Sequence, residues 1–166
     1  RQHIQHMLLQ RQLYAKRIHL STSSMWESLS VAIDTMSQFK TQFPNTKGRQ
    51  TADTRDLARL ACATTLSRVH GVTDLFYLNN GAYPKDSNYI SGLLIDTLCR
   101  VAQSFTANNR PWPKHLFLQL DNATGENKNH NVFATCDLLV TLGIFQQVLH
   151  TYICVAAMYV VVIKSE

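Results

Sequence analysis

The sequence is poor in the residues that build unusual architectures. Its 166 residues include only six glycines, four prolines and four cysteines, which excludes collagen-like repeats and disulfide miniproteins. Charged residues make up only 16 %, a composition that excludes a coiled coil, and a hydrophobic content of 45 % is typical of a globular rather than a disordered chain. A chain of this length buries roughly 70 % of its unfolded surface and needs no disulfide or metal to fold. We therefore expect one ordinary domain.

The cysteines and the amino end carry no sign of export. Cys62, Cys99, Cys136 and Cys154 lie far apart and form no C-x-x-C pair, so zinc-site spacing is absent and reduced thiols are expected. The opening RQHIQHMLLQRQLYAKR is basic and amphipathic, without the apolar core and small-residue cleavage site of a secretory signal. These features predict a nuclear or other intracellular protein.

Charge alone does not identify a partner. Sixteen Lys and Arg against eleven Asp and Glu give a formal net charge of +5, and the sequence pI is about 9.2. Such an excess is compatible with binding to a polyanion such as nucleic acid, but many basic domains bind none.

The carboxyl end holds the longest apolar run, VLHTYICVAAMYVVVI at residues 148–163. A membrane-spanning helix needs about 20 apolar residues, so this run is short unless residues 142–145 are added. Its β-branched and aromatic residues favour a buried strand, and we expect residues 149–166 to form an apolar strand or irregular tail. A membrane attachment through residues 142–163 is the alternative.

The remaining chain alternates between helical and strand patterns. We expect an amino-terminal helix over 2–17 that ends at a polar break over 21–24, and an ambiguous segment over 57–66. Further helices are expected over 86–105 and over 129–142, the latter stopped by Gly143, with strands over 29–34, 69–78 and 115–121. This order predicts an α/β fold, a mixed sheet flanked by helices. The expected division is a helical segment 1–24, a domain 25–148 and the tail 149–166.

Two expected strands end on an aspartate, Asp34 and Asp121. Ligand sites in α/β sheets gather beyond the carboxyl ends of the strands, so the two carboxylates converge if the strands are neighbours. Two such charges repel unless a cation neutralises them, and oxygen ligands suit Mg²⁺. Paired carboxylates that hold two metal ions about 4 Å apart are typical of phosphodiester cleavage. The alternative is that each aspartate only caps a strand or turn.

A polar run follows Asp121 and leads into the last expected helix. Free amide groups at a helix amino terminus attract phosphate, and Asn or Lys side chains can hold a nucleic-acid backbone without reading bases. A long solvated loop with a helix cap is the alternative. The run contains Asn122, Glu126, Asn127, Lys128 and Asn129.

Three segments of the chain resemble one family. LFLQLDNATGENKNHNVFATCDLLVTLGIF resembles the family's central motif, LQLDN-x-x-G-E-NKN followed by a helix and LV-x-x-G-x-F. RQLYAKR resembles its ER-x-x-Y helix, and SVAIDTMSQFKTQFP resembles its S-I-x-x-D-x-M-D-Q-x-K-x-x-x-P segment. The family consists of transposon-derived sequences of eukaryotic genomes and is catalogued as domain of unknown function 7869. The resemblance covers about residues 8 to 148.

The resemblance implies a ribonuclease-H-like fold of the kind used by DDE/D transposases and integrases. Asp34 matches the first acidic position and Asp121 the second, which makes both the expected catalytic residues and ligands of Mg²⁺ or Mn²⁺. Phosphodiester cleavage or strand transfer on nucleic acid, with DNA as the first candidate, is the implied activity, without a small-molecule cofactor. The implied nucleic-acid-binding residues are Asn122, Asn127, Lys128 and Asn129.

The chain also departs from the family pattern. Ser37-Gln38 stands where the family has an acidic residue before Gln, and LHTYICVAAMYVVVIKSE replaces the GHTHED-x-D motif that supplies a third acid. Glu126 and Asp137 are the nearest substitutes. Because the first residue is Arg1 and the third acid is missing, we expect a fragment with an incomplete fold. An inactive, domesticated relict that acts only as a nucleic-acid-binding or interaction module is therefore the alternative function.

Overall fold

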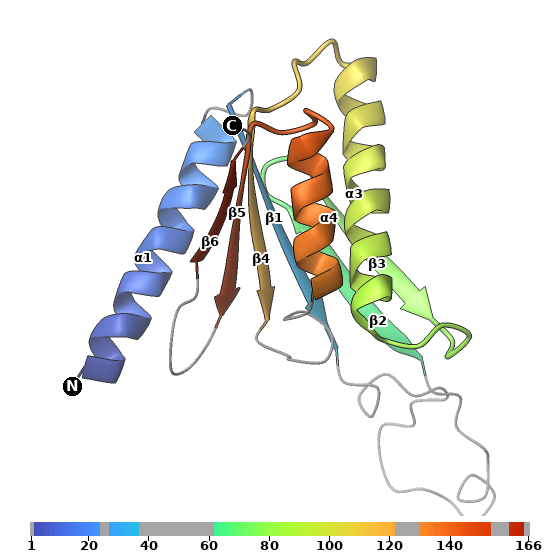
Figure 1. The fold of residues 1–166 in the computed structure, drawn as a ribbon, viewed down its shortest axis with the longest axis horizontal. Helices are drawn as coiled ribbons and strands as arrows, with labels where there is room; N and C mark the ends of the chain where they lie inside the picture. Colours follow the sequence, from blue (N-terminus) through green and yellow to red (C-terminus); the bar gives the residue numbers. More distant parts are fainter. Residues whose placement is uncertain (1, 24–26, 37–61, 122–129, 154–159, 165–166) are drawn as a thin grey trace, which may run out of the picture.

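The computed structural model describes residues 2–23, 27–36, 62–121, 130–153 and 160–164. Within these residues, six strands form one mixed sheet in the order β3-β2-β1-β4-β5-β6, flanked by three helices (Figure 1). This confirms the expected α/β architecture. The elements are α1 (Gln2–Ser23), β1 (Ser28–Thr35), β2 (Ala63–Val69), β3 (Thr73–Asn79), α3 (Ser87–Ala107), β4 (His115–Asp121), α4 (His130–Thr141), β5 (Gln147–Ile153) and β6 (Val160–Lys164).

The strands pair in both directions. β1, β2 and β3 are antiparallel neighbours, β1 pairs in parallel with β4, β4 pairs in parallel with β5, and β6 closes the sheet antiparallel to β5. The parallel pairs are connected through helices, because α3 precedes β4 and α4 lies between β4 and β5. This topology is consistent with the ribonuclease-H-like arrangement that the resemblance implies.

The alternation of side chains divides the sheet into two faces. On one face, the odd residues of β1 and the even residues of β4 are buried leucines, valines and isoleucines that pack with α3 and α4. On the other face, Ser28 and Ser30 are buried although they are polar. Their small size lets the third helix, α1, lie close to β1. Figure 1 shows α3 and α4 side by side and α1 apart from them.

Local signals explain where α3 and α4 begin and end. The Asp86 carboxylate accepts a hydrogen bond from the backbone N–H of Tyr89 at 3.0 Å and caps α3. At the end of α4, Gly143 adopts φ +69°, and the backbone N–H of Ile144 donates to the carbonyl of Leu139 at 3.0 Å. This is the Schellman pattern, in which a left-handed residue satisfies the last helical carbonyls. The stop at Gly143 was expected from the sequence.

The amino-terminal helix is longer than the sequence pattern indicated. Residues 21–24 were expected to form a polar break, but α1 continues to Ser23. The hydroxyls of Ser21 and Thr22 both donate to the carbonyl of Ile18, at 3.0 Å and 2.9 Å, and the hydroxyl of Ser23 donates to an earlier helical carbonyl as well. Such bonds keep serine and threonine within a helix. The expected break was wrong at residues 21–23, and Ser24 lies outside the described residues.

The expected strand over 69–78 is two strands. β2 ends at Val69, the chain turns at Gly71 with φ +76°, and β3 begins at Thr73. The positive φ is the conformation that glycine adopts without strain. The paired residues Arg68 and Asp74 form a two-pronged ion pair across this hairpin, with N···O distances of 2.9 Å and 2.8 Å. Residues 63–66 of the ambiguous segment belong to β2.

The apolar run near the carboxyl end contributes two strands to the sheet. β5 lies between β4 and β6, and it crosses the boundary at residue 148 that the sequence suggested. In the described part of the chain, no helix is both long and apolar enough to cross a membrane. The described residues of the 142–163 segment include β5 and the first four residues of β6.

Gly143 and Gly92 provide a matched pair of glycine substitutions with opposite expected signs. Gly143→Ala should lower the free energy of unfolding by about 1 kcal/mol, because alanine is strained at φ +69°. Gly92→Ala, in α3, should raise it by up to about 1 kcal/mol, because the added Cβ would meet nothing within 4 Å and alanine favours the helix. Urea unfolding of both variants measures the difference. If both substitutions changed the free energy of unfolding equally, the left-handed conformation of Gly143 at the end of α4 would be contradicted.

Candidate functional site

The register of the two central strands brings Asp34 and Asp121 to the same level. β1 and β4 run in parallel, and the last pair in their register is Ile33 with Leu120. Asp34 and Asp121 are the next residues on the two strands. Neighbouring strands lie about 4.8 Å apart, so the backbones of the two aspartates stand side by side at the carboxyl edge of the sheet. The condition for convergence, that the two strands are neighbours, is therefore met.

Asp34 is accessible from solvent. Its neighbours Ile33 and Val31 are buried among core residues, whereas Asp34 is exposed on the face that carries α1. On the other side of β1 it pairs with Leu66 of β2. An exposed carboxylate at the end of a buried strand is free to bind a ligand from solvent. The backbone of Asp121 is described, but its side chain and the expected nucleic-acid-binding residues Asn122, Asn127, Lys128 and Asn129 lie outside the described part.

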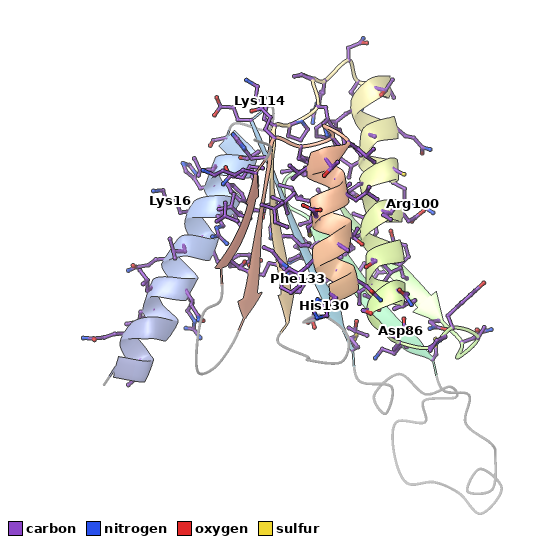
Figure 2. The ribbon with its side chains drawn as sticks, in the orientation of Figure 1. Lys16, Asp86, Arg100, Lys114, His130 and Phe133 are labelled. Atoms are coloured by element: carbon purple, nitrogen blue, oxygen red, sulfur yellow. The ribbon has the colours of Figure 1, made fainter. Side chains whose placement is uncertain are left out.

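Two helix amino termini meet at this same edge. α4 follows β4 and therefore begins at its carboxyl end, while α3 runs back from that edge before β4 begins. The side-chain amide of Asn131 donates hydrogen bonds to Ser87 Oγ and to Asn88 Oδ1, each at 2.9 Å. Figure 2 shows Asp86 and His130 at this end of the molecule and Lys114 at the other. Helix amino termini carry partial positive charge, so the edge favours anionic ligands near the aspartates.

On the opposite side of the sheet, α1 is attached by two polar contacts. The first links Tyr14 to His70, with 3.0 Å between Tyr14 Oη and His70 Nε2, while His70 Nδ1 lies 3.2 Å from the carbonyl oxygen of Ser30. Burial lowers the pKa of His70, which favours the neutral ring. A neutral ring with its proton on Nδ1 donates to Ser30 and accepts from Tyr14.

The second contact is made by Arg17. Its Nη1 donates to Thr151 Oγ1 at 3.0 Å, and its guanidinium carbon lies 5.5 Å from the centre of the Phe117 ring. Sequence reasoning missed Tyr14, Arg17 and His70 as members of this face. The signals were the resemblance of RQLYAKR, residues 11–17, and of VHGV, residues 69–72, to family segments, and they do not say what the side chains contact.

The described residues contain no replacement for a third acidic ligand. Asp137 is exposed on α4, which packs on the face of the sheet opposite to the side of Asp34. Glu126 lies outside the described residues. Within the described ranges, no group of three His, Cys, Asp or Glu side chains is arranged to hold a metal ion. The register thus brings two of the candidate ligands together and leaves Asp137 apart from them.

Two titratable side chains, those of His150 and Cys136, are buried in the core. His150 of β5 is fully buried and lies against the Phe133 ring of α4, with 5.4 Å between ring centres. Burial lowers the pKa of His150 to about 4 and raises the pKa of the buried Cys136 thiol to about 12. Both groups are therefore neutral at physiological pH, and Cys136 acts as a small apolar side chain.

Comparison with known families gives one match. A family model described as "Domain of unknown function (DUF7869)" matches residues 52–159, well over half of the chain. The matched range contains Asp121 and the polar run after it, and it begins after Asp34. No curated protein and no solved structure matches the chain. The family expected from the sequence motifs is therefore the one found.

The buried His150 predicts a specific acid sensitivity. Its pKa in the folded state, about 4, is below the ordinary value of 6.5, so the unfolded chain binds the proton first as pH falls. The contribution of His150 to stability is fully present above about pH 6.5 and is lost towards pH 4, by about 3 kcal/mol. His150→Leu should therefore reduce the difference in free energy of unfolding between pH 7 and pH 4.5.

Urea unfolding at the two pH values measures this difference. The control is His130→Gln, which replaces a histidine that is exposed at the start of α4 rather than buried in the core. An unaltered pH dependence in His150→Leu would contradict the burial of a neutral imidazole.

Proposed function

The chain belongs to the domain of unknown function 7869 family, and we propose that it is a nucleic-acid-processing domain that cleaves or transfers phosphodiester bonds with carboxylate-bound divalent metal. The observation that carries this proposal is the parallel register that sets Asp34 level with Asp121 at the carboxyl edge. Two aspartates are seldom placed side by side without a cation, because the like charges repel.

The donor chemistry of this pair suits Mg²⁺ or Mn²⁺. Both candidate ligands are carboxylates, the hard oxygen donors that these ions prefer, and Mg²⁺ keeps several water molecules when one or two carboxylates bind it. Asp34 and Asp121 would hold the metal. When bound, the divalent ions activate an attacking water or 3′-hydroxyl and stabilise the leaving oxygen. The protein orients the two carboxylates on rigid central strands, which favours precise positioning of a bound phosphate.

The surroundings of the pair favour a polyanionic substrate. The amino termini of α3 and α4 face the same edge, and the net charge of the chain is +5. Asn122, Asn127, Lys128 and Asn129 follow Asp121 directly in the sequence and would contact the sugar-phosphate backbone. Phosphate contacts fix the position of a strand and carry no base sequence information, so DNA of any sequence is the natural test substrate. A DNA substrate would place this activity in the nucleus.

A second candidate is a nucleic-acid-binding module without catalysis. It is favoured by one observation, that no third acidic ligand accompanies Asp34 in the described ranges. Such a module would keep the phosphate-binding edge and lack the complete metal centre. The two candidates differ in cleavage and agree in salt-dependent binding.

Nicking of supercoiled plasmid DNA with Mg²⁺ or Mn²⁺ distinguishes them. We expect Asp34→Asn and Asp121→Asn each to lower the nicking rate at least about a hundred-fold, the usual cost of losing a group that stabilises charge in the transition state. Glu27→Gln is the matched control, because Glu27 is exposed before the other end of β1. It should leave the rate unchanged.

The outcomes separate the candidates clearly. Metal-dependent nicking that both aspartate variants lose supports the enzyme. Salt-sensitive DNA binding without nicking supports the binding module. Nicking that is unaffected by either aspartate substitution would contradict the proposed metal pair.

A further inference from the structure

Arg17 is a half-buried cation without an acidic partner among the described residues. Its contacts there are the hydroxyl of Thr151 and the face of the Phe117 ring. Burial lowers the pKa of Arg17, whereas hydrogen bonds that they donate to Asp74 and Asp96 raise the pKa of Arg68 and Arg100. Arginine remains charged in proteins, and a partly buried charge normally has a counter-ion. Arg17 therefore differs from Arg68 and Arg100, which both form ion pairs.

The guanidinium lies on the same face of the sheet as Asp34. Thr151 follows the buried His150, which faces α4, so Thr151 lies on the opposite face, where α1 packs. Phe117, between the buried Leu116 and Leu118, lies on that face as well. Asp34 shares it, because its neighbour Ile33 points into the core. Arg17 and Asp34 thus share one surface.

The strand register places Arg17 a short distance before the aspartate edge. Thr151 pairs with Gln119, and Gln119 pairs with Ala32, two residues before Asp121 and Asp34 respectively. At about 3.3 Å per residue, this level is roughly 7 Å from the aspartates along the strands. Ala32 and Gln119 are only half-buried, so this strip of the sheet is partly accessible. An extended anion bound at Asp34 and Asp121 can therefore continue across the strip to Arg17.

We propose that Arg17 binds a backbone phosphate of the nucleic-acid strand, adjacent to the phosphate that a metal ion on Asp34 and Asp121 would hold. This inference rests on the proposed function for its ligand, and it assigns a substrate-binding role to α1. One N–H of the guanidinium holds Thr151, and the Phe117 ring supports its plane, which leaves other N–H groups to form charge-assisted bonds to phosphate oxygens. The contact positions the strand and does not read its bases.

A purely structural role for Arg17 predicts different behaviour. If Arg17 only attaches α1 to the sheet, its replacement lowers the stability of the fold. The loss of DNA affinity is then no larger than the loss caused by replacing any other surface arginine. Arg11 is the matched control, since it is exposed on the same helix and carries the same charge. Thr151→Val tests the attachment itself, because it removes the hydroxyl that accepts from Arg17 and keeps the guanidinium.

The experiment measures binding of the full chain to a fluorescein-labelled single-stranded DNA oligonucleotide in EDTA, over a series of salt concentrations. Without metal there is no cleavage, and the assay measures only the phosphate contacts that need no metal ion, such as the one proposed for Arg17. Arg17→Gln should weaken binding about tenfold at low salt. It should also reduce the slope of log K against log salt by about 1, the change expected when one phosphate contact is lost. Arg11→Gln should change both values much less. Arg17→Lys should restore the slope and only part of the affinity.

A second measurement uses the wild-type chain and does not depend on variants that fold. Phenylglyoxal modifies arginine side chains, and the modified positions are found by peptide mass spectrometry. Bound DNA should protect Arg17 at least several-fold more than Arg11.

The outcomes distinguish a phosphate-binding Arg17 from a purely structural one. A reduced slope in Arg17→Gln, with protection of Arg17 in the wild type, supports the inference even if the nicking assay fails. Equal effects of the Arg11 and Arg17 substitutions, or equal protection of both residues, overturn it and leave the aspartate pair unaffected. A wild-type chain that binds no DNA overturns this inference and the nucleic-acid partner together.

Discussion

The structure depends on one contact above all, the parallel pairing of β1 with β4. These strands occupy the centre of the sheet, and their register runs from Ser28 with His115 to Ile33 with Leu120. The apolar residues of both strands face the same core, so a slip of one residue would turn the leucines of β4 towards α1. Burial of these side chains therefore stabilises the register. The same register sets Asp34 level with Asp121, so the packing of the core also determines the geometry of the candidate site.

The parts of this arrangement that depend on local signals could be predicted from the sequence. β1 and β4 show alternating apolar residues, a helix was expected over residues 86–105, and Gly143 ends α4, and each of these expectations is confirmed. Two expectations failed where a local pattern has two readings. The run around Gly71 alternates like a single strand, but glycine allows the tight turn that divides it. The serines after α1 look like a break, but their hydroxyls bond back to the helix.

The site itself could be predicted only in part, because strand order is a long-range property. The two aspartates were visible as strand ends, and the family motifs supported their pairing, but only the sheet shows that they are neighbours. The contacts that α1 makes with the sheet could not be predicted from the sequence. Tyr14 and His70 are 56 residues apart, and Arg17 and Thr151 are 134 apart, so no periodicity or spacing motif connects them. Polar contacts across a sheet face leave no pattern in a single sequence. They also join α1 to the same face of the sheet as Asp34.

The central claim is that Asp34 and Asp121 share a divalent metal, and a crystal structure of the full chain grown with Mn²⁺ tests it most directly. The anomalous signal of the ion locates it independently of the protein atoms. The account predicts Mn²⁺ at the carboxyl edge of β1 and β4, bound by oxygen atoms of both aspartates at about 2 Å. Carboxyl groups more than about 8 Å apart, too distant for a shared pair of metal ions, would contradict the claim.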